Sequence, residues 1–193
     1  FVTFNLTPPS EEILQNIFEK IIVNYYDQPT FKSPIKDCTP KMVKMLLNVY
    51  SHVQERLPPT PSKFHYIFTI RDIGRVIEGC CLATPDKFTK DSQVIRLWRN
   101  ECTRLFCDRL TTSDDVNIVN LKIEEQINDH FGNIRDDVMK DPLVFGDFSC
   151  AVERLRADED GGYEDPQLYE DQGTYIDVRK TFDDALEEYN VER

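Results

Sequence analysis

Apolar residues recur every three or four positions along most of residues 10–140 of this chain. This spacing places them on one face of an α-helix, so the pattern predicts a series of amphipathic helices that share a core. We expect five helices, beginning after Ser10, at Thr39-Pro40, after Thr69, near Asp91 and near Asp114. A further helix is expected from Thr174 to Glu192. A chain of 193 residues can form one such domain, and the predicted fold class is mostly α.

The segments between the helices show other patterns. Apolar and polar residues alternate over 2–6, which predicts one short N-terminal strand that ends at the two prolines 8–9. A loop that contains Pro29 and Pro34 is expected before the second helix. Residues 158–162 combine acidic residues with glycine and are expected to form a loop within an acidic C-terminal extension.

Negative charge is concentrated near the C-terminus. The chain has 35 acidic and 23 basic residues, a net charge of -12. Residues 153–193 hold 14 acidic and 5 basic residues, a net charge of -9, which leaves -3 for residues 1–152. Such a chain is not expected to bind nucleic acid or an anionic membrane through its overall field. No apolar run approaches the roughly 20 residues of a membrane-spanning helix. We therefore expect neither nucleic acid nor a membrane as a partner.

The sequence lacks the common catalytic motifs. None of the seven glycines opens a phosphate loop of the G-x-x-x-x-G-K-[ST] type, and no nucleophile elbow or zinc-protease motif is present. The six cysteines and three histidines lack the spacing of a metal site, so we expect buried free thiols and no metal. We expect no catalytic residue and no enzyme activity from this chain alone. It begins with Phe1 instead of Met, which favours a piece of a longer protein.

Two arginines lie on the polar face of the third predicted helix. Arg71 and Arg75 are placed opposite the apolar face that begins with Ile73, close to the N-terminus of the helix. One interpretation is an exposed basic pair in which Arg75 pairs with Glu78 at i,i+3 spacing. The other is that Arg71 points toward an anion, because a positive charge at a helix N-terminus opposes the helix dipole.

Three stretches of the sequence resemble the dynein heavy chains, especially axonemal outer-arm types. Residues 57–79, L-P-P-T-P-S-K-F-H-Y-I-F-T-I-R-D-I-G-R-V-I-E-G, are similar to a stretch in their third AAA+ module. Residues 97–110, L-W-R-N-E-C-T-R-L-F-C-D-R-L, are similar to a second stretch, and residues 143–148 resemble the lead-in to the fourth module. The sequence departs from the family at Thr69, Gly74 and Asn100, where Asn, Ser and His are usual.

The resemblance implies a helical AAA+ lid. Residues 1–9 would be the last strand of the preceding large subdomain, residues 10–140 the lid, and residues 141–193 a connector and the first helix of the next module. Arg71 matches the sensor-2 arginine, which reaches the phosphates of the nucleotide, and Arg75 matches a supporting arginine. ATP or ADP with magnesium would bind at the upstream large subdomain, and this chain alone would bind none.

The resemblance also implies a parent protein and its partners. The parent would be an ATP-driven microtubule motor of cilia or flagella, with the third site gating the main ATPase site. Its partners would be the adjacent AAA+ modules, microtubules, and dynein intermediate and light chains. It would belong to the cytoplasm, the cytoskeleton and the ciliary or flagellar axoneme. The alternative is a free-standing acidic helical adaptor that binds proteins through Val178, Phe182, Leu186 and Tyr189.

Overall fold

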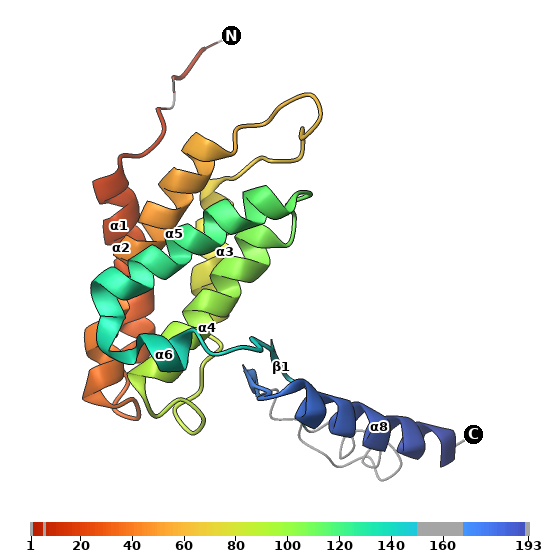
Figure 1. Ribbon diagram of the computed structural model, residues 1–193. Helices are drawn as coiled ribbons and strands as arrows, with labels where there is room; N and C mark the ends of the chain where they lie inside the picture. Colours follow the sequence, from red (N-terminus) through yellow and green to blue (C-terminus); the bar gives the residue numbers. More distant parts are fainter. Residues whose placement is uncertain (1, 6, 150–167, 192–193) are drawn as a thin grey trace.

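The structure, a computed structural model, describes residues 2–5, 7–149 and 168–191. Its helices are α1 (Glu11–Tyr26), α2 (Ser33–Arg56), α3 (Ile70–Cys80), α4 (Asp91–Cys102), α5 (Ser113–Phe131), α6 (Arg135–Val138) and α8 (Tyr175–Val191). Helices α1 to α5 pack in one bundle, and α8 lies beyond it (Figure 1). The predicted mostly helical fold is confirmed. None of the helices in the described ranges combines the length and apolar character needed to cross a lipid bilayer.

Helix α2 lies at the centre of the bundle. It contacts α1, α3, α4 and α5, and its buried side chains extend from Ile35 to Val53 on more than one face. A helix that is apolar on several faces has to be enclosed by other helices, which explains this central place. Trp98 of α4 and Phe106, which follows α4, are also fully buried. They belong to the same hydrophobic core as the buried side chains of α2.

The start of α2 differs from the prediction. The helix begins at Ser33, with Pro34 in its first turn, and Pro40 lies inside it. The predicted start at Thr39-Pro40 was therefore wrong. Proline in the first turn breaks no helical hydrogen bond, but an internal proline removes one. The Thr39 hydroxyl donates to the carbonyl oxygen of Lys36 at 2.9 Å. It thus supplies a donor to the carbonyl that the missing N–H of Pro40 would have bonded.

The predicted N-terminal strand is not formed. The described residues of 2–10 have no regular secondary structure, and Val2 and Phe4 are about 80% exposed. A strand needs a neighbouring strand to bond its backbone, and none of the described strands lies beside this segment. Figure 1 shows the segment leaving the bundle at the end where residues 57–69 form a loop.

The other predicted helices are confirmed, with changes at their ends. The fourth continues beyond α4 as a π-helical turn, Thr103–Cys107. The fifth ends at Phe131, and Gly132 follows it. Its φ of -56° is not left-handed, so the chain continues through a 3-10 turn, Gly132–Ile134, into α6. The predicted acidic loop 158–162 lies outside the described residues.

A two-residue antiparallel ladder joins the C-terminal part to the bundle. Strand β1 (Phe145–Gly146) pairs with β2 (Glu170–Asp171). Arg96 of α4 donates through Nε to the Asp171 carboxylate at 2.5 Å and through Nη2 to the Pro142 carbonyl at 2.5 Å. The guanidinium of this buried arginine therefore ties both sides of the ladder to α4. In α8, Phe182 stacks on Phe148 with ring centroids 5.1 Å apart, yet remains 53% exposed.

Helices α3 and α4 approach closely at a buried carboxylate. Glu101 of α4 is fully buried, and its Oε2 accepts from Arg104 Nη2 at 2.6 Å. Its Oε1 accepts from the Tyr169 hydroxyl at 2.8 Å and from Asn100 Nδ2 at 3.0 Å. A Cβ at Gly79 of α3 would overlap this carboxylate. Only glycine leaves room for it at this position.

We expect opposite effects from alanine at the two glycines of α3. Gly79→Ala should destabilise the fold by about 1–3 kcal/mol, because the buried Glu101 carboxylate has to move away from its donors. Gly74→Ala places its Cβ 3.9 Å from Phe18, an ordinary contact. It should stabilise the fold by about 0.4–1 kcal/mol, because alanine restricts the unfolded chain. Urea unfolding of the two variants measures both changes. Equal effects at the two positions would contradict the close approach of the helices.

Candidate functional site

The N-terminus of α3 is capped by its own side chains. The backbone N–H of Thr69 donates to Asp72 Oδ2 at 2.7 Å, and the Thr69 hydroxyl lies 3.2 Å from the same oxygen. Thr69 has extended φ and ψ angles, as an N-cap residue should. The predicted start of this helix after Thr69 is confirmed. The cap defines the first turn of the helix, and Arg71 is the second residue of that turn.

Arg71 and Arg75 lie on the outward face of α3, as predicted. Both are exposed, whereas Ile73 and Val76 on the opposite face are fully buried. Neither arginine forms an ion pair with any residue in the part of the chain that the structure describes. The considered pair between Arg75 and Glu78 is absent, so the interpretation as an exposed intrahelical pair is wrong for Arg75. Near the helix N-terminus, two guanidinium groups thus have no acidic partner among the residues that the structure describes.

Exposed apolar side chains lie on the helix beside α3 and in the loop before it. Gly74 of α3 faces Phe18 of α1, so the two helices lie side by side. Ile13, Ile17 and Ile21 form an exposed stripe along α1, each about half exposed. The same helix buries Leu14, Phe18 and Ile22, in each case the residue that follows an exposed isoleucine. In the loop before α3, Phe64 and Ile67 are 72% and 59% exposed.

The loop before α3 is fastened to the start of α5. Lys63 forms an ion pair with Asp115, and the Tyr66 hydroxyl donates to the same carboxylate at 2.8 Å. The backbone N–H of Thr111 donates to the Tyr66 hydroxyl at 2.9 Å. Hydrogen bonds from Lys63 and Thr112 lower the pKa of Asp115 to about 2, against a smaller opposing effect of burial. These contacts hold the loop, and with it the start of α3, against the bundle.

A second anchor of α3 comes from Arg109. Its Nη2 donates to Asp72 Oδ1 at 2.9 Å, and its Nη1 donates to the Ile67 carbonyl at 3.1 Å. Burial alone would raise the pKa of Asp72, but the hydrogen bonds from Thr69 and Arg109 outweigh it and lower that pKa below its usual value. Sequence reasoning did not identify Arg109 or Asp115 as parts of the site. The Asp-Arg-Leu that ends the second family-like stretch, residues 108–110, was the available signal for Arg109.

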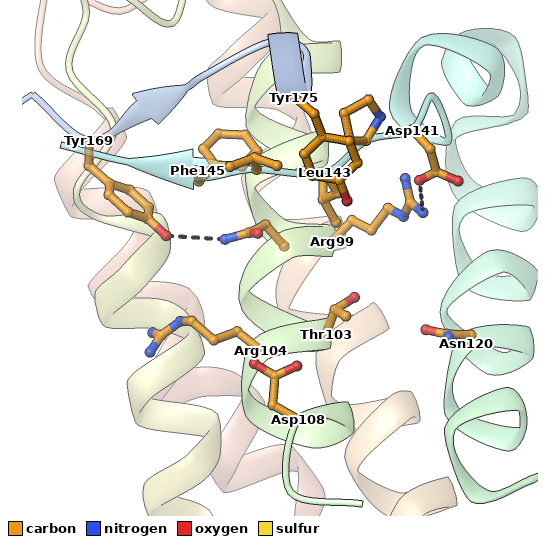
Figure 2. Close-up of a pocket in the computed structure, with 13 residues that line it drawn as sticks. Arg99, Thr103, Arg104, Asp108, Asn120, Asp141, Leu143, Phe145, Tyr169 and Tyr175 are labelled. Atoms are coloured by element: carbon orange, nitrogen blue, oxygen red, sulfur yellow. Dashed lines mark hydrogen bonds and ion pairs between the residues drawn. The ribbon is translucent and has the colours of Figure 1, made fainter. Parts of the chain in front are cut away.

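A cleft lies elsewhere, between α4, α5 and the C-terminal segments (Figure 2). Its volume is about 880 Å³. Arg99 in its wall pairs with Asp141 at 3.1 Å, and Arg104 pairs with the buried Glu101. Asn100, where the family has His, donates to the Tyr169 hydroxyl at 3.1 Å. Because both arginines already have acidic partners, this cleft is a weaker anion site than the start of α3.

The thiols are not arranged for chemistry. Cys38, Cys80, Cys102 and Cys107 are buried and free, as predicted, and Cys81 is half-buried. Burial raises the pKa of Cys38 to about 12 and that of Cys107 to about 12, which makes thiolates scarce at neutral pH. Cys150 lies outside the described residues. Over 2–5, 7–149 and 168–191, no three His, Cys, Asp or Glu side chains gather as metal ligands would.

Comparison with known proteins points to one family. The family described as "Dynein heavy chain, ATPase lid domain" matches residues 14–116, which include both Arg71 and Arg75. Human "Dynein axonemal heavy chain 10" is 39% identical over 190 residues, 98% of this chain and 4% of that protein. In Chlamydomonas reinhardtii, "Dynein-1-alpha heavy chain, flagellar inner arm I1 complex" is 34% identical over 196 residues, 100% of this chain and 4% of that protein. "Dynein gamma chain, flagellar outer arm", from the same alga, is 28% identical over 163 residues, 77% of this chain and 4% of that protein.

The low pKa of Asp115 predicts a loss of stability in acid. Its folded pKa of about 2 lies below the ordinary value of about 3.9. The carboxylate therefore stabilises the fold above pH 4, and this contribution is lost as the pH falls from about 4 to about 2. Lys63→Met should move the pKa of Asp115 back toward the ordinary value, because the Lys63 hydrogen bond is the largest cause of the shift. NMR titration of the Asp115 carboxyl measures this pKa in the variant. An unchanged pKa in this variant would show that Lys63 does not hold the loop.

Proposed function

This chain belongs to the dynein heavy chain family, and from this premise we propose that residues 10–140 form the lid of a regulatory nucleotide site. The observation that carries the proposal is the exposed Arg71 in the capped first turn of α3, without an acidic partner among the described residues. A guanidinium is permanently charged and presents a fork of donors that matches phosphate oxygens. An uncompensated arginine at this position is suited to reach the terminal phosphate of a nucleotide held by another subdomain.

The neighbourhood of Arg71 supports docking against a second body. The stripe of Ile13, Ile17 and Ile21 lies on the neighbouring helix, and the N-terminal segment leaves the bundle at the end where the loop before α3 lies (Figure 1). A large subdomain that precedes residue 10 would meet apolar side chains and two arginines together. It would hold ATP or ADP with magnesium, while Arg71 acts as sensor 2 and Arg75 supports it.

We assign the flanking segments to the neighbouring subdomains. Residues 1–9 would become a strand once the preceding large subdomain offers a neighbouring strand. Residues 141–193 would be the connector and the first helix of the next module. The exposed residues Phe182 and Leu186 of α8 would then pack within that module instead of serving a free adaptor.

The chain spans about 4% of the length of these relatives, so the activity of the parent is part of the proposal. The parent would be an ATP-driven microtubule motor of the ciliary or flagellar axoneme, in which this chain belongs to the third module and the third site gates the main ATPase site. Its partners would be the adjacent modules, microtubules, and intermediate and light chains. The relatives include both an inner-arm and an outer-arm chain, so outer-arm type stays a prediction.

The proposal predicts unequal effects of two substitutions in the parent protein. Arg71→Ala should weaken nucleotide binding at this site by about ten- to hundredfold, because it removes a charge-assisted contact worth about 1.5–3 kcal/mol. Arg75→Ala should weaken it less, and neither substitution should change lid stability much, since both side chains are exposed. Titration with a fluorescent ADP measures the affinity. Unchanged affinity in Arg71→Ala would show that Arg71 is only a solvated surface charge.

A second prediction concerns residues 1–193 alone. This chain should bind magnesium-ATP no more tightly than about millimolar, because two exposed arginines give little contact for the cost of association. Isothermal titration calorimetry measures the affinity. Micromolar binding would mean that the chain contains a nucleotide site of its own, and the lid proposal would then fail.

A further inference from the structure

We propose that Arg109 is a positioning residue for Arg71, because it fixes the first turn of α3 and so the direction in which Arg71 projects. The inference rests on the proposed function, in which Arg71 contacts the nucleotide. It assigns a task to an arginine that does not itself lie on the outward face of α3.

The guanidinium of Arg109 makes three contacts around the start of α3. It donates to Asp72 at 2.9 Å and to the Ile67 carbonyl at 3.1 Å. Its central carbon lies 5.1 Å from the ring centre of Phe68, a cation–π contact. One rigid, planar group thus bonds Ile67, which precedes the helix, and Asp72, which accepts the capping hydrogen bond from Thr69. A lysine could make one of these bonds but could not span both acceptors in the same way.

The two carboxylate oxygens of Asp72 bind different groups, one in the helix cap and the other on Arg109. Oδ2 accepts from the backbone N–H of Thr69 at 2.7 Å, and Oδ1 accepts from Arg109. The side chain of Asp72 is only 7% exposed, so loss of the arginine would leave a nearly buried carboxylate without its cation. Such a carboxylate would gain by turning toward water, and that movement would open the cap.

Arg109 is itself held in place by the bundle. Its carbonyl oxygen lies 3.1 Å from His65 Nε2, and the next residue, Leu110, donates its backbone N–H to the Cys107 carbonyl at 2.9 Å. The arginine therefore extends from the end of the π-helical turn that continues α4. It connects the position of α3 to a helix whose Trp98 and Glu101 are fully buried.

Arg71 depends on this anchor because no hydrogen bond or ion pair from another described residue holds its side chain. Its side chain has no ion pair with a residue in the described ranges, so its direction follows from the backbone of the first turn. The first turn of a helix lacks intrahelical partners for its N–H groups and frays when its cap is lost. Removal of Arg109 should therefore widen the range of positions that the Arg71 guanidinium visits.

A double-mutant cycle in the parent protein tests the inference. Arg109→Ala should weaken fluorescent-ADP binding at this site by about three- to tenfold, less than Arg71→Ala, because it loosens the contact without removing it. In the Arg71→Ala background, Arg109→Ala should change the affinity by less than about twofold, because no contact is left to position. Arg109→Lys and Asp72→Asn are milder variants, and each should give an intermediate loss.

The control is Arg135→Ala, which removes an ion pair of 2.5 Å with Glu124 at another part of the bundle and should leave the affinity unchanged. If Arg109→Ala lowers the affinity equally in both backgrounds, or not at all, Arg109 does not act through Arg71 and the inference is overturned while the proposed function stands. If Arg71→Ala itself has no effect, the proposed function fails and the inference fails with it.

Discussion

The buried carboxylate of Glu101 is the interaction on which the arrangement of this chain depends. A charge without exposure costs several kcal/mol unless donors surround it, and here the donors come from Arg104, Asn100 and Tyr169. Tyr169 belongs to a segment 68 residues further along the chain. On the other side, Gly79 lets the backbone of α3 approach the same carboxylate. One side chain therefore relates α3, α4 and the C-terminal segment to one another.

Helix α3 is thus fixed at both of its ends. Gly79 lies against Glu101 near its C-terminus, and Asp72 binds Arg109 in its first turn. Both fixed points lead to α4 or to the π-helical turn that extends it. Movement of the first turn of α3 would therefore disturb these contacts, and α4 in turn binds the Pro142 carbonyl through Arg96 and the Val138 carbonyl through Arg99. The contacts form a continuous path from the proposed phosphate contact to the segment that follows the bundle.

The helices could be predicted because their signals are local. In α3, for example, the cap joins Thr69 to Asp72, three residues apart, and the buried face extends only from Ile73 to Cys80. The start of α2 could not be predicted in this way, because a proline usually marks the first turn of a helix, whereas Pro40 lies inside α2, where the Thr39 hydroxyl donates to the Lys36 carbonyl. The strand at 2–6 follows the right alternation, but a strand also needs a neighbour, which periodicity does not reveal. The stripe on α1 shows the same limit, because its pattern cannot tell which isoleucines face the core.

In the candidate site, the exposed Arg71 could be predicted from the sequence, but Arg109 and Asp115, which hold the start of α3 in place, could not. Arg71 could be found from its place on the helix and from the resemblance, whereas the partners of Asp72 and Lys63 lie 37 and 52 residues away. Several arginines nevertheless share a role that the sequence does not show. Arg96, Arg104 and Arg109 each bind a carboxylate that is at least partly buried. Arg71 and Arg75 bind no acid among the described residues, although the chain carries a net charge of -12. An exposed arginine without an acidic partner is solvated by water and is also available to bind an anion, and the proposed function assigns that anion to the phosphate of a nucleotide on a neighbouring subdomain.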